Sequence, residues 1–449
     1  MDANSLQVYP LARYAAEHWI SHAKSGDIDS TPGLQKLATH LLLHHHVRTN
    51  WTRIWDIDVP WISKINIARA AYNAAPPLYH ASMSGLEVVV QLLLENHTDI
   101  NALTQGGRYG NALQAASLQG SEAIVKMLIE SGADVHAQGG EYGNALQAAS
   151  YRGSEAIVKM LIESGADVNA QGGCYGNVLQ AASFQGSETI VKILIESGAD
   201  VHAQGGHFGN AVQAASFHGS EAILKMLIEN GADVNAQGGV YGNALQAASF
   251  QGCEAIVKML IESGADANAQ GGWCGSTLQA ASFPGSEAIV KMLIESGADV
   301  HAHGGKYGNA LQAASYHGSD AIVKMLIESG ADVNAQGGYY GSALQAASYQ
   351  GSEAIVKMLI DRGADVNAQG GHYGSVLQAA SRGGSAAIVK MLIDNGADVN
   401  VWGGRYGSAL QAALSHGYLG IAQLLRDNGA EVGDLPEIPS DSEDYGDSE

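Results

Sequence analysis

One short stretch, QGGWCGSTLQAASFPG from Gln270 to Gly285, gathers residue types that carry out chemistry. Cys274, Ser276 and Ser282 are potential nucleophiles, and glycines lie beside them as they do in loops that cradle phosphate groups. Such nucleophiles need a neighbouring general base, and a phosphate loop needs a lysine at a fixed spacing. The stretch is therefore the first candidate for an active site.

Three adjacent histidines, His44 to His46, are a candidate for a metal site. Neighbouring residues diverge around a helix, whereas metal ligands have to converge on one ion. We therefore predict no metal and no cofactor.

The candidate active site loses its special status because the stretch recurs. Marker residues step by 33 positions: Tyr109, Tyr142, Tyr175, Phe208, Tyr241, Cys274, Tyr307, Tyr340, Tyr373 and Tyr406. A fixed period of this length indicates stacked supersecondary units, and a divergent eleventh unit, residues 76–102, precedes the ten regular ones. A catalytic constellation is assembled once, and GGxYG lacks the lysine of a phosphate loop, so we predict that the chain is not an enzyme. An enzyme centred on Cys274 or the histidines remains the remote alternative.

The sequence of each unit predicts two short antiparallel helices followed by a projecting hairpin loop. Asn144 caps the first helix and Gly153 ends it, and Ser154 and Gly165 play these parts for the second. The remaining ADVNAQGGxYG is too rich in glycine for a helix. The expected element is a helix-turn-helix with a hairpin.

Period, order and caps together resemble the ankyrin repeat, over about residues 73–432. The family motif T-P-L-H-x-A is NALQAA at residues 144–149, and the GADVNA exit is kept almost everywhere. The resemblance implies an all-α ankyrin-repeat solenoid. Glutamine replaces the motif histidine in all ten regular units, from Gln114 to Gln411, and we predict a buried ladder of hydrogen bonds between repeats.

The ends of the chain differ from the array. Residues 1–72 are expected to be a helical N-terminal capping region, 73–432 the array, and 433–449 an acidic disordered tail. The last unit is expected to present a polar outer face. The segment Tyr9–Lys24 resembles the helices that lead into the arrays of fungal NACHT-ankyrin receptor-like proteins, but the sequence has no P-loop, so nucleotide switching does not follow.

The net charge and the hydropathy pattern exclude several classes of binding partner. A net charge of −22 argues against nucleic acid and acidic membranes, and no segment reads as a signal peptide or a membrane span. Three cysteines without paired spacing fit a reducing compartment, so we expect a cytoplasmic or nuclear protein with no small-molecule substrate.

Differences between the repeats gather in two columns. The residue after the double glycine passes through nearly every chemical class: Arg108, Glu141, Cys174, His207, Val240, Trp273, Lys306, Tyr339, His372 and Arg405. The residue near the end of the first helix is aromatic in seven consecutive units: Tyr151, Phe184, Phe217, Phe250, Phe283, Tyr316 and Tyr349. With helices about 8 to 10 Å apart, the rings should form a ladder of that spacing.

The resemblance implies protein binding through hairpin tips and the concave face of the first helices. We predict that all seven aromatic residues bind a partner protein, together with the tip residues Arg108, Glu141, His207, Trp273, Lys306, Tyr339, His372 and Arg405. Alternatively the aromatic residues only seal the interfaces between repeats, or the acidic array masks a basic segment of a transcription or chromatin factor. Cys274 beside Trp273 suggests a notch in the row of loops.

Overall fold

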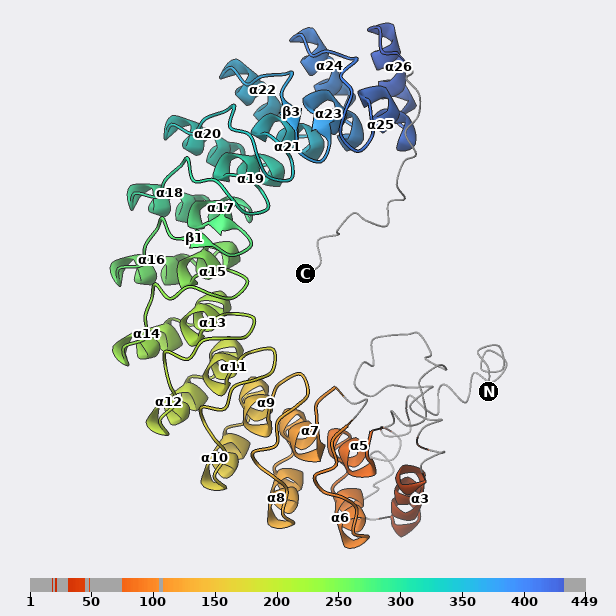
Figure 1. The fold of residues 1–449 in the computed structure, drawn as a ribbon, viewed down its shortest axis with the longest axis vertical. Coiled ribbons are helices and arrows are strands. Elements are labelled where there is room, and N and C mark those ends of the chain that lie inside the picture. The colour runs from red at the N-terminus through yellow and green to blue at the C-terminus, as the bar shows by residue number, and fades with distance from the viewer. Residues whose placement is uncertain are drawn as a thin grey trace, which may run out of the picture. The chain divides into compact units, whose positions relative to one another are not determined.

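A computed structural model shows the fold (Figure 1) and describes residues 18, 21, 31–44, 48, 75–104 and 108–431. Most of the receptor-like stretch Tyr9–Lys24 lies outside these ranges, as do His45, His46 and the acidic tail 433–449. Contacts divide the chain into two compact units, Met1–Asp233 and Val234–Glu449.

Within the described residues, the first unit has helix α3 ahead of the array and then five helix pairs. The helices are α3 (Pro32–Leu43), α5 (Pro77–Met83), α6 (Glu87–Glu95), α7 (Ala112–Gln119), α8 (Glu122–Glu130), α9 (Ala145–Arg152), α10 (Glu155–Glu163), α11 (Val178–Gln185), α12 (Glu188–Glu196), α13 (Ala211–His218) and α14 (Glu221–Glu229). Helix α3 lies in the N-terminal region and packs against α5 and α6.

The second unit continues the pattern with six helix pairs and two small hairpins. Its elements are α15 (Ala244–Gln251), α16 (Glu254–Glu262), β1 (Gln270–Gly271), β2 (Gly275–Ser276), α17 (Thr277–Ser282), α18 (Glu287–Glu295), α19 (Ala310–His317), α20 (Asp320–Glu328), α21 (Ala343–Gln350), α22 (Glu353–Asp361), β3 (Gln369–Gly370), β4 (Gly374–Ser375), α23 (Val376–Gly383), α24 (Ala386–Asp394), α25 (Ala409–Ser415) and α26 (Leu419–Asp427). Strands β1 and β2 pair antiparallel, as do β3 and β4.

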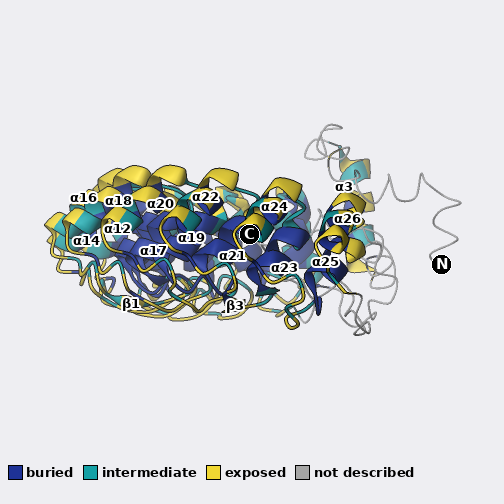
Figure 2. Cartoon of the chain, turned by 90° about the horizontal axis from the view of Figure 1, so that it is seen from above, coloured by how far each residue is buried: buried dark blue, intermediate teal, exposed yellow. Residues whose placement is uncertain are grey.

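Within each unit the first helices of consecutive repeats pack in one layer and the second helices in another (Figure 1). In the second unit the first helices are buried, while the second helices expose one face (Figure 2). Alanines such as Ala148 and Ala149 are fully buried between neighbouring first helices, and their small side chains let the repeats approach closely. The predicted all-α solenoid of helix-turn-helix repeats is confirmed.

Helix ends follow the predicted caps with two differences. Asn144 and Ser276 each accept a hydrogen bond from the backbone N–H of the third helical residue, as an N-cap does. Ser154 stands at the N-cap position of α10, but its side chain makes no capping bond there. Helix α17 ends at Ser282, whereas most of its counterparts, such as α19, are two residues longer, because Pro284 lacks the N–H that another helical turn needs.

The glutamine column joins neighbouring repeats as predicted. The Nε2 of Gln312 donates to the carbonyls of Ala335, Gly337 and Gly341 in the next hairpin, at 3.0–3.3 Å. Bonds of this kind also start from Gln114, Gln147, Gln246, Gln279, Gln345 and Gln378. The amide thus reaches the loop backbone of the following repeat instead of another glutamine.

The last repeat departs from the polar outer face expected of a cap. Leu414 and Tyr418 stay more than a third exposed, and Leu419 at the start of α26 is 72% exposed. The prediction of a polar terminal repeat is therefore wrong at these positions, which leave apolar surface near the end of the second unit.

Candidate protein-interaction surface

The varied tip residues lie on a regular backbone. We call them the tip row: residues 108, 141, 174 and 207 in the first unit, and 240, 273, 306, 339, 372 and 405 in the second. Tip N–H groups donate to the tip carbonyl of the preceding repeat, from Glu141 to Arg108 at 2.9 Å and from Tyr339 to Lys306 at 2.9 Å. The same bond links every consecutive pair within each unit, at 2.7–3.2 Å. Since only backbone atoms make these bonds, the tip side chain is free to vary.

The double glycine explains why the loop backbone itself does not vary. Gly272 has φ +60°, and a Cβ built there would lie 2.3 Å from the carbonyl carbon of Tyr241 in the preceding repeat. Gly140 has the same relation to Tyr109, at 2.5 Å. The hairpins therefore stack so closely that only glycine fits at this column.

Several tip side chains contact their neighbours along the row. Arg108 forms an ion pair with Glu141, and this hydrogen bond raises the pKa of the guanidinium above its ordinary value. The Lys306 ammonium lies 5.2 Å from the centre of the Trp273 ring, which suits a cation–π contact. The rings of Tyr339 and His372 stack at 4.7 Å. Cys174, His207 and Val240 are exposed, and the other tips are half-buried.

The seven aromatic residues at the ends of the first helices form an edge row, which packs against an inner row of marker residues. Tyr151 stacks on Tyr142 and Tyr175 of the inner row, with ring centres 4.8 and 5.1 Å away, and Tyr316 stacks 4.5 Å from Tyr340. Every edge-row residue is half-buried. These rings thus contribute to the interfaces between repeats and also present part of their surface to solvent.

The rings lie closer together than the predicted 8 to 10 Å. Edge-row neighbours are 6.2 Å apart between Phe184 and Phe217, 5.9 Å between Phe250 and Phe283, and 6.4 Å between Tyr316 and Tyr349. The prediction used the distance between helix axes, whereas side chains tilt until aromatic faces reach their stacking distance.

No notch opens beside Cys274. The Cys274 side chain is buried, and the Trp273 ring lies edge-on to Phe250, Phe283 and Tyr307 at 5.5–5.9 Å. In other repeats the inner-row aromatic residue lies between two edge-row rings, as Tyr307 does between Phe283 and Tyr316. Trp273 therefore takes over the contacts that Cys274 is too small to make.

The chemistry of this region does not support a nucleophile. Burial raises the pKa of the Cys274 thiol to about 12, so the thiol stays protonated near neutral pH. Ser276 caps α17, and Ser282 donates to the Leu278 carbonyl at 2.7 Å. The two serines therefore have structural roles, and Cys274 is buried and protonated.

The histidine cluster is only partly within the described residues. The His44 ring stacks on His40 at 3.7 Å, and its Nδ1 lies 2.8 Å from the His40 carbonyl. Among the residues that the structure describes, no three His, Cys, Asp or Glu side chains gather as metal ligands would. In the same ranges no helix is long and apolar enough to cross a lipid bilayer.

A second row, which the sequence analysis missed, joins the loops that follow the second helices. We call it the exit row: seven asparagines, Asn101, Asn169, Asn235, Asn268, Asn334, Asn367 and Asn400, and three histidines, His136, His202 and His301. The Asn334 side chain donates to the Gly363 carbonyl at 3.0 Å and accepts from the Asp365 N–H at 2.8 Å, both in the next repeat. All seven asparagines make this pair of bonds.

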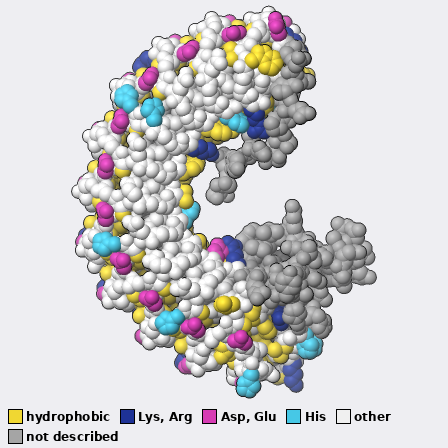
Figure 3. Space-filling view, in the orientation of Figure 1, with side chains coloured by type: hydrophobic (Ala, Val, Ile, Leu, Met, Phe, Trp, Pro, Cys, Tyr) yellow, Lys and Arg dark blue, Asp and Glu magenta, His cyan; other side chains and the backbone are white. Residues whose placement is uncertain are grey.

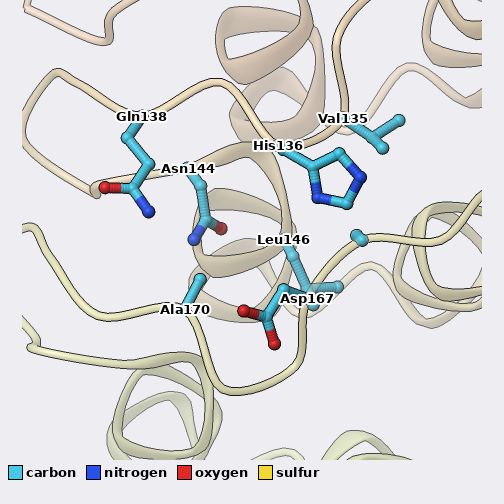
Figure 4. A pocket seen from close by; sticks show the side chains of 8 residues that line it. Val135, His136, Gln138, Asn144, Leu146, Asp167 and Ala170 are labelled. Carbon is cyan, nitrogen blue, oxygen red and sulfur yellow. The ribbon is translucent and has the colours of Figure 1, made fainter.

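The exit histidines interrupt this row. Within the described residues, His136 and His301 make neither of the two bonds, because an imidazole cannot present an amide's donor and acceptor in that geometry. A pocket of about 80 Å³ lies beside His136, between it and Asp167 of the next exit loop (Figure 4). Its lining has no serine, cysteine or lysine to act as a nucleophile. The alternation of VNA with VHA is the sequence signal that could have revealed this row.

Acidic and basic side chains share the second helices, where pairs such as Lys324 and Glu328 lie 3.9 Å apart. Figure 3 shows acidic side chains spaced along the edge where the second helices lie, and hydrophobic side chains with some Lys and Arg on the edge where the first helices lie. In the second unit the tip row and the two residues that end each first helix include Lys306, Arg382 and Arg405 but no Asp or Glu. The strongly negative net charge therefore belongs to other surfaces.

Comparison with known proteins agrees with this architecture. A family model described as ankyrin repeats (3 copies) matches residues 40–139, 78–172, 113–205, 178–271 and 277–370, and a single ankyrin repeat matches 375–403. The azaphilone pigments biosynthesis cluster protein L of Monascus ruber is 38% identical over 146 residues, which are 30% of this chain and 30% of that protein. The human ASB11 ankyrin repeat domain is 24% identical, with a TM-score of 0.42 over 49% of this chain and 97% of that domain.

Proposed function

Since this chain belongs to the ankyrin repeat family, whose repeats generally mediate protein–protein interactions, we propose that it is a non-catalytic recognition scaffold that binds a protein partner through its tip row and edge row. The tip row is the observation that carries the proposal. In each unit, side chains of many classes are displayed on a repeated frame of backbone hydrogen bonds, so their chemistry can change without a change of fold. Varied side chains on a rigid frame are what a selective binding surface needs.

The edge row supports the proposal with anchoring groups. Its seven aromatic side chains are half-buried, so their rings are held by neighbours before any partner arrives. Rigid aromatic groups lose little conformational entropy on binding and supply large apolar contacts. The tip residues would then select among partners that the aromatic residues anchor.

The charge pattern favours a neutral or acidic binding segment over a basic one. Lys306, Arg382 and Arg405 lie along the tips and first-helix ends of the second unit, where the sequence has no acidic residue. A basic segment, as in the masking of a transcription or chromatin factor, would be repelled there and attracted to the other edge.

The test is quantitative capture of partners from a lysate by the immobilised full chain. Replacing Lys306, His372 and Arg405 together by Ala should lower the recovery of a specific partner at least tenfold. The control, Lys324→Ala, removes an exposed lysine from the outer helix α20 and should leave recovery unchanged. Equal recovery by both variants would refute a binding role for the tip row.

Charge reversal separates the two kinds of partner. Lys306→Glu with Arg405→Glu should weaken an acidic or neutral partner. A basic partner would instead bind more tightly to the reversed surface, and its affinity for the unmodified chain would fall steeply with salt.

A further inference from the structure

The column that holds the edge row continues with an arginine after its seven aromatic residues. Arg382 stands in this column, and its guanidinium carbon lies 5.8 Å from the centre of the Tyr349 ring, the last of the edge row. Its Nε donates at 3.0 Å to the hydroxyl of Tyr406, a buried inner-row residue of the next repeat. A guanidinium has five N–H donors, and this bond uses one of them while it orients the group.

A second arginine lies beside the same tyrosine. The guanidinium carbon of the tip residue Arg405 lies 6.0 Å from the centre of the Tyr406 ring. Its Nη1 lies 3.4 Å from Nε2 of the preceding tip, His372, which accepts this bond as a neutral imidazole because arginine can only donate. The His372 ring stacks in turn on Tyr339. Rings of neighbouring repeats therefore position both Arg382 and Arg405, which we call the arginine pair.

Acidic residues are missing from the two repeats that contain the arginine pair. The second helix of every earlier regular repeat begins with an acidic residue, as α22 does with Glu353, whereas α24 begins with Ala386 and α26 with Leu419. As a result, residues 366–393 and 399–426 contain no Asp or Glu. An acidic residue at this position stabilises a helix, so its loss does not serve the stability of α24 or α26. The loss instead raises the positive potential around the arginine pair.

The arginine pair suits a phosphate group better than a carboxylate. Guanidinium groups donate paired N–H bonds to either anion. A phosphate monoester carries about −1.5 to −2 charges near neutral pH and three acceptor oxygens, so it matches two cations, whereas a carboxylate carries a single charge. Nucleic acids and anionic membranes also present phosphates, but a net charge of −22 repels such extended polyanions. A single phosphate on a protein segment meets the local positive potential without this penalty.

We propose that the arginine pair binds the phosphate of a phosphorylated side chain in the partner protein. This inference rests on the proposed function, because Arg405 belongs to the tip row and Arg382 continues the column of the edge row. The aromatic rings beside the pair, such as Tyr349, contact the residues that flank the phosphate. Phosphorylation of the partner thereby switches its binding to this end of the second unit.

The test measures the affinity of the full chain for defined pools of labelled peptides with random flanks. One pool has a central phosphotyrosine or phosphoserine, and the reference pool has tyrosine or serine there. The full chain should bind the phosphorylated pool at least about tenfold more tightly. Arg382→Gln combined with Arg405→Gln should abolish this preference. The control Arg362→Gln changes an exposed arginine at the end of the outer helix α22 and should preserve it.

A single variant keeps the test informative if the double variant is unstable. Arg405→Gln leaves the bond from Arg382 to Tyr406 in place and should lower the affinity for the phosphorylated pool several-fold, with little effect on the reference pool. An unchanged affinity for the phosphorylated pool would overturn the proposal.

Two further outcomes would also overturn it. The first is equal affinity of the unmodified chain for the two pools. The proposed function would survive that result, because its own test compares partner recovery with and without tip side chains. The second is binding to vesicles that contain phosphatidylinositol phosphates, if it exceeds peptide binding and is lost in Arg382→Gln with Arg405→Gln, since the phosphate would then belong to a lipid.

Discussion

The tip row and the exit row both join consecutive repeats in each unit, but different atoms make the connections. In the tip row a backbone N–H meets a backbone carbonyl, and the side chain takes no part. In the exit row the asparagine side chain makes both bonds, and histidine in its place makes neither at His136 or His301. Where backbone atoms make the bonds between repeats, the side chain can be substituted without loss of those bonds. Where side chains make the bonds, a substitution removes them and weakens the contact between repeats.

The largest effect is expected from breaking the close approach of the tip loops. Gly272→Ala should destabilise the second unit by about 3 kcal/mol, from left-handed strain plus overpacking against Tyr241. Urea unfolding measures the loss. Gly264→Ala is the control: its φ of +84° gives comparable strain, but an added Cβ would meet nothing within 4 Å, so only about 1 kcal/mol should be lost. Similar losses in both variants would contradict the stacking argument.

Removing one side-chain link of the exit row should have an intermediate effect. Asn334→Ala deletes the bonds to Gly363 and Asp365 and should cost about 1 kcal/mol, since both bonds are exposed to solvent. Gln336→Ala changes an exposed amide two residues away and should cost almost nothing. If the two substitutions lowered the free energy of unfolding equally, the exit row would not link the repeats.

Restoring the side-chain bonds of the exit row at a histidine should raise the free energy of unfolding by a smaller amount. His136→Asn should create bonds to the Gly165 carbonyl and the Asp167 N–H and stabilise the first unit by about 0.5 kcal/mol. His301→Asn tests the same change in the second unit, where a pocket lies at the equivalent place. A fall in Tm for both variants would show that the histidines make stabilising contacts of their own.

The smallest effect is expected in the tip row. Cys174→Arg should change the free energy of unfolding by less than about 0.5 kcal/mol, because the side chain is exposed and the bonds to Glu141 and His207 use backbone atoms. Tyr175→Ala alters the adjacent inner-row residue and should cost about 3 kcal/mol, because its ring stacks on Tyr151 and Phe184. A large loss in Cys174→Arg would undermine the tip row as a surface free to diverge.

The sequence predicted the parts of the fold that depend on local chemistry. A period of 33 residues, caps such as Asn144 and the buried glutamine column all predicted structure correctly, because capping and amphipathic periodicity act within one or two repeats. Predictions failed where side chains of adjacent repeats adjust to one another. The spacing of the aromatic rings and the place of the Trp273 ring beside Cys274 are two examples.

The candidate surface divides in the same way. The varied tip column could be found by comparing repeats, since variation shows in letters alone. The reason that this column tolerates variation could not be found from the sequence. Backbone hydrogen bonds between tips 33 residues apart do not restrict the residue type at the tip. The exit row is visible in the sequence as the alternation of VNA with VHA. Its role could not be predicted, because it depends on bonds to a carbonyl and an N–H of the next repeat.

By itself the sequence determined the repeat, its helices and which columns vary, because each repeat carries its own caps, apolar stripe and glycine turns. Only the tertiary structure decided in which columns the side chains bond neighbouring repeats and in which columns backbone atoms do so, leaving the side chain free to vary. That distinction depends on distances between atoms of neighbouring repeats, such as the 2.3 Å between a Cβ built at Gly272 and the carbonyl carbon of Tyr241, and the 2.8 Å between the Asn334 side chain and the Asp365 N–H.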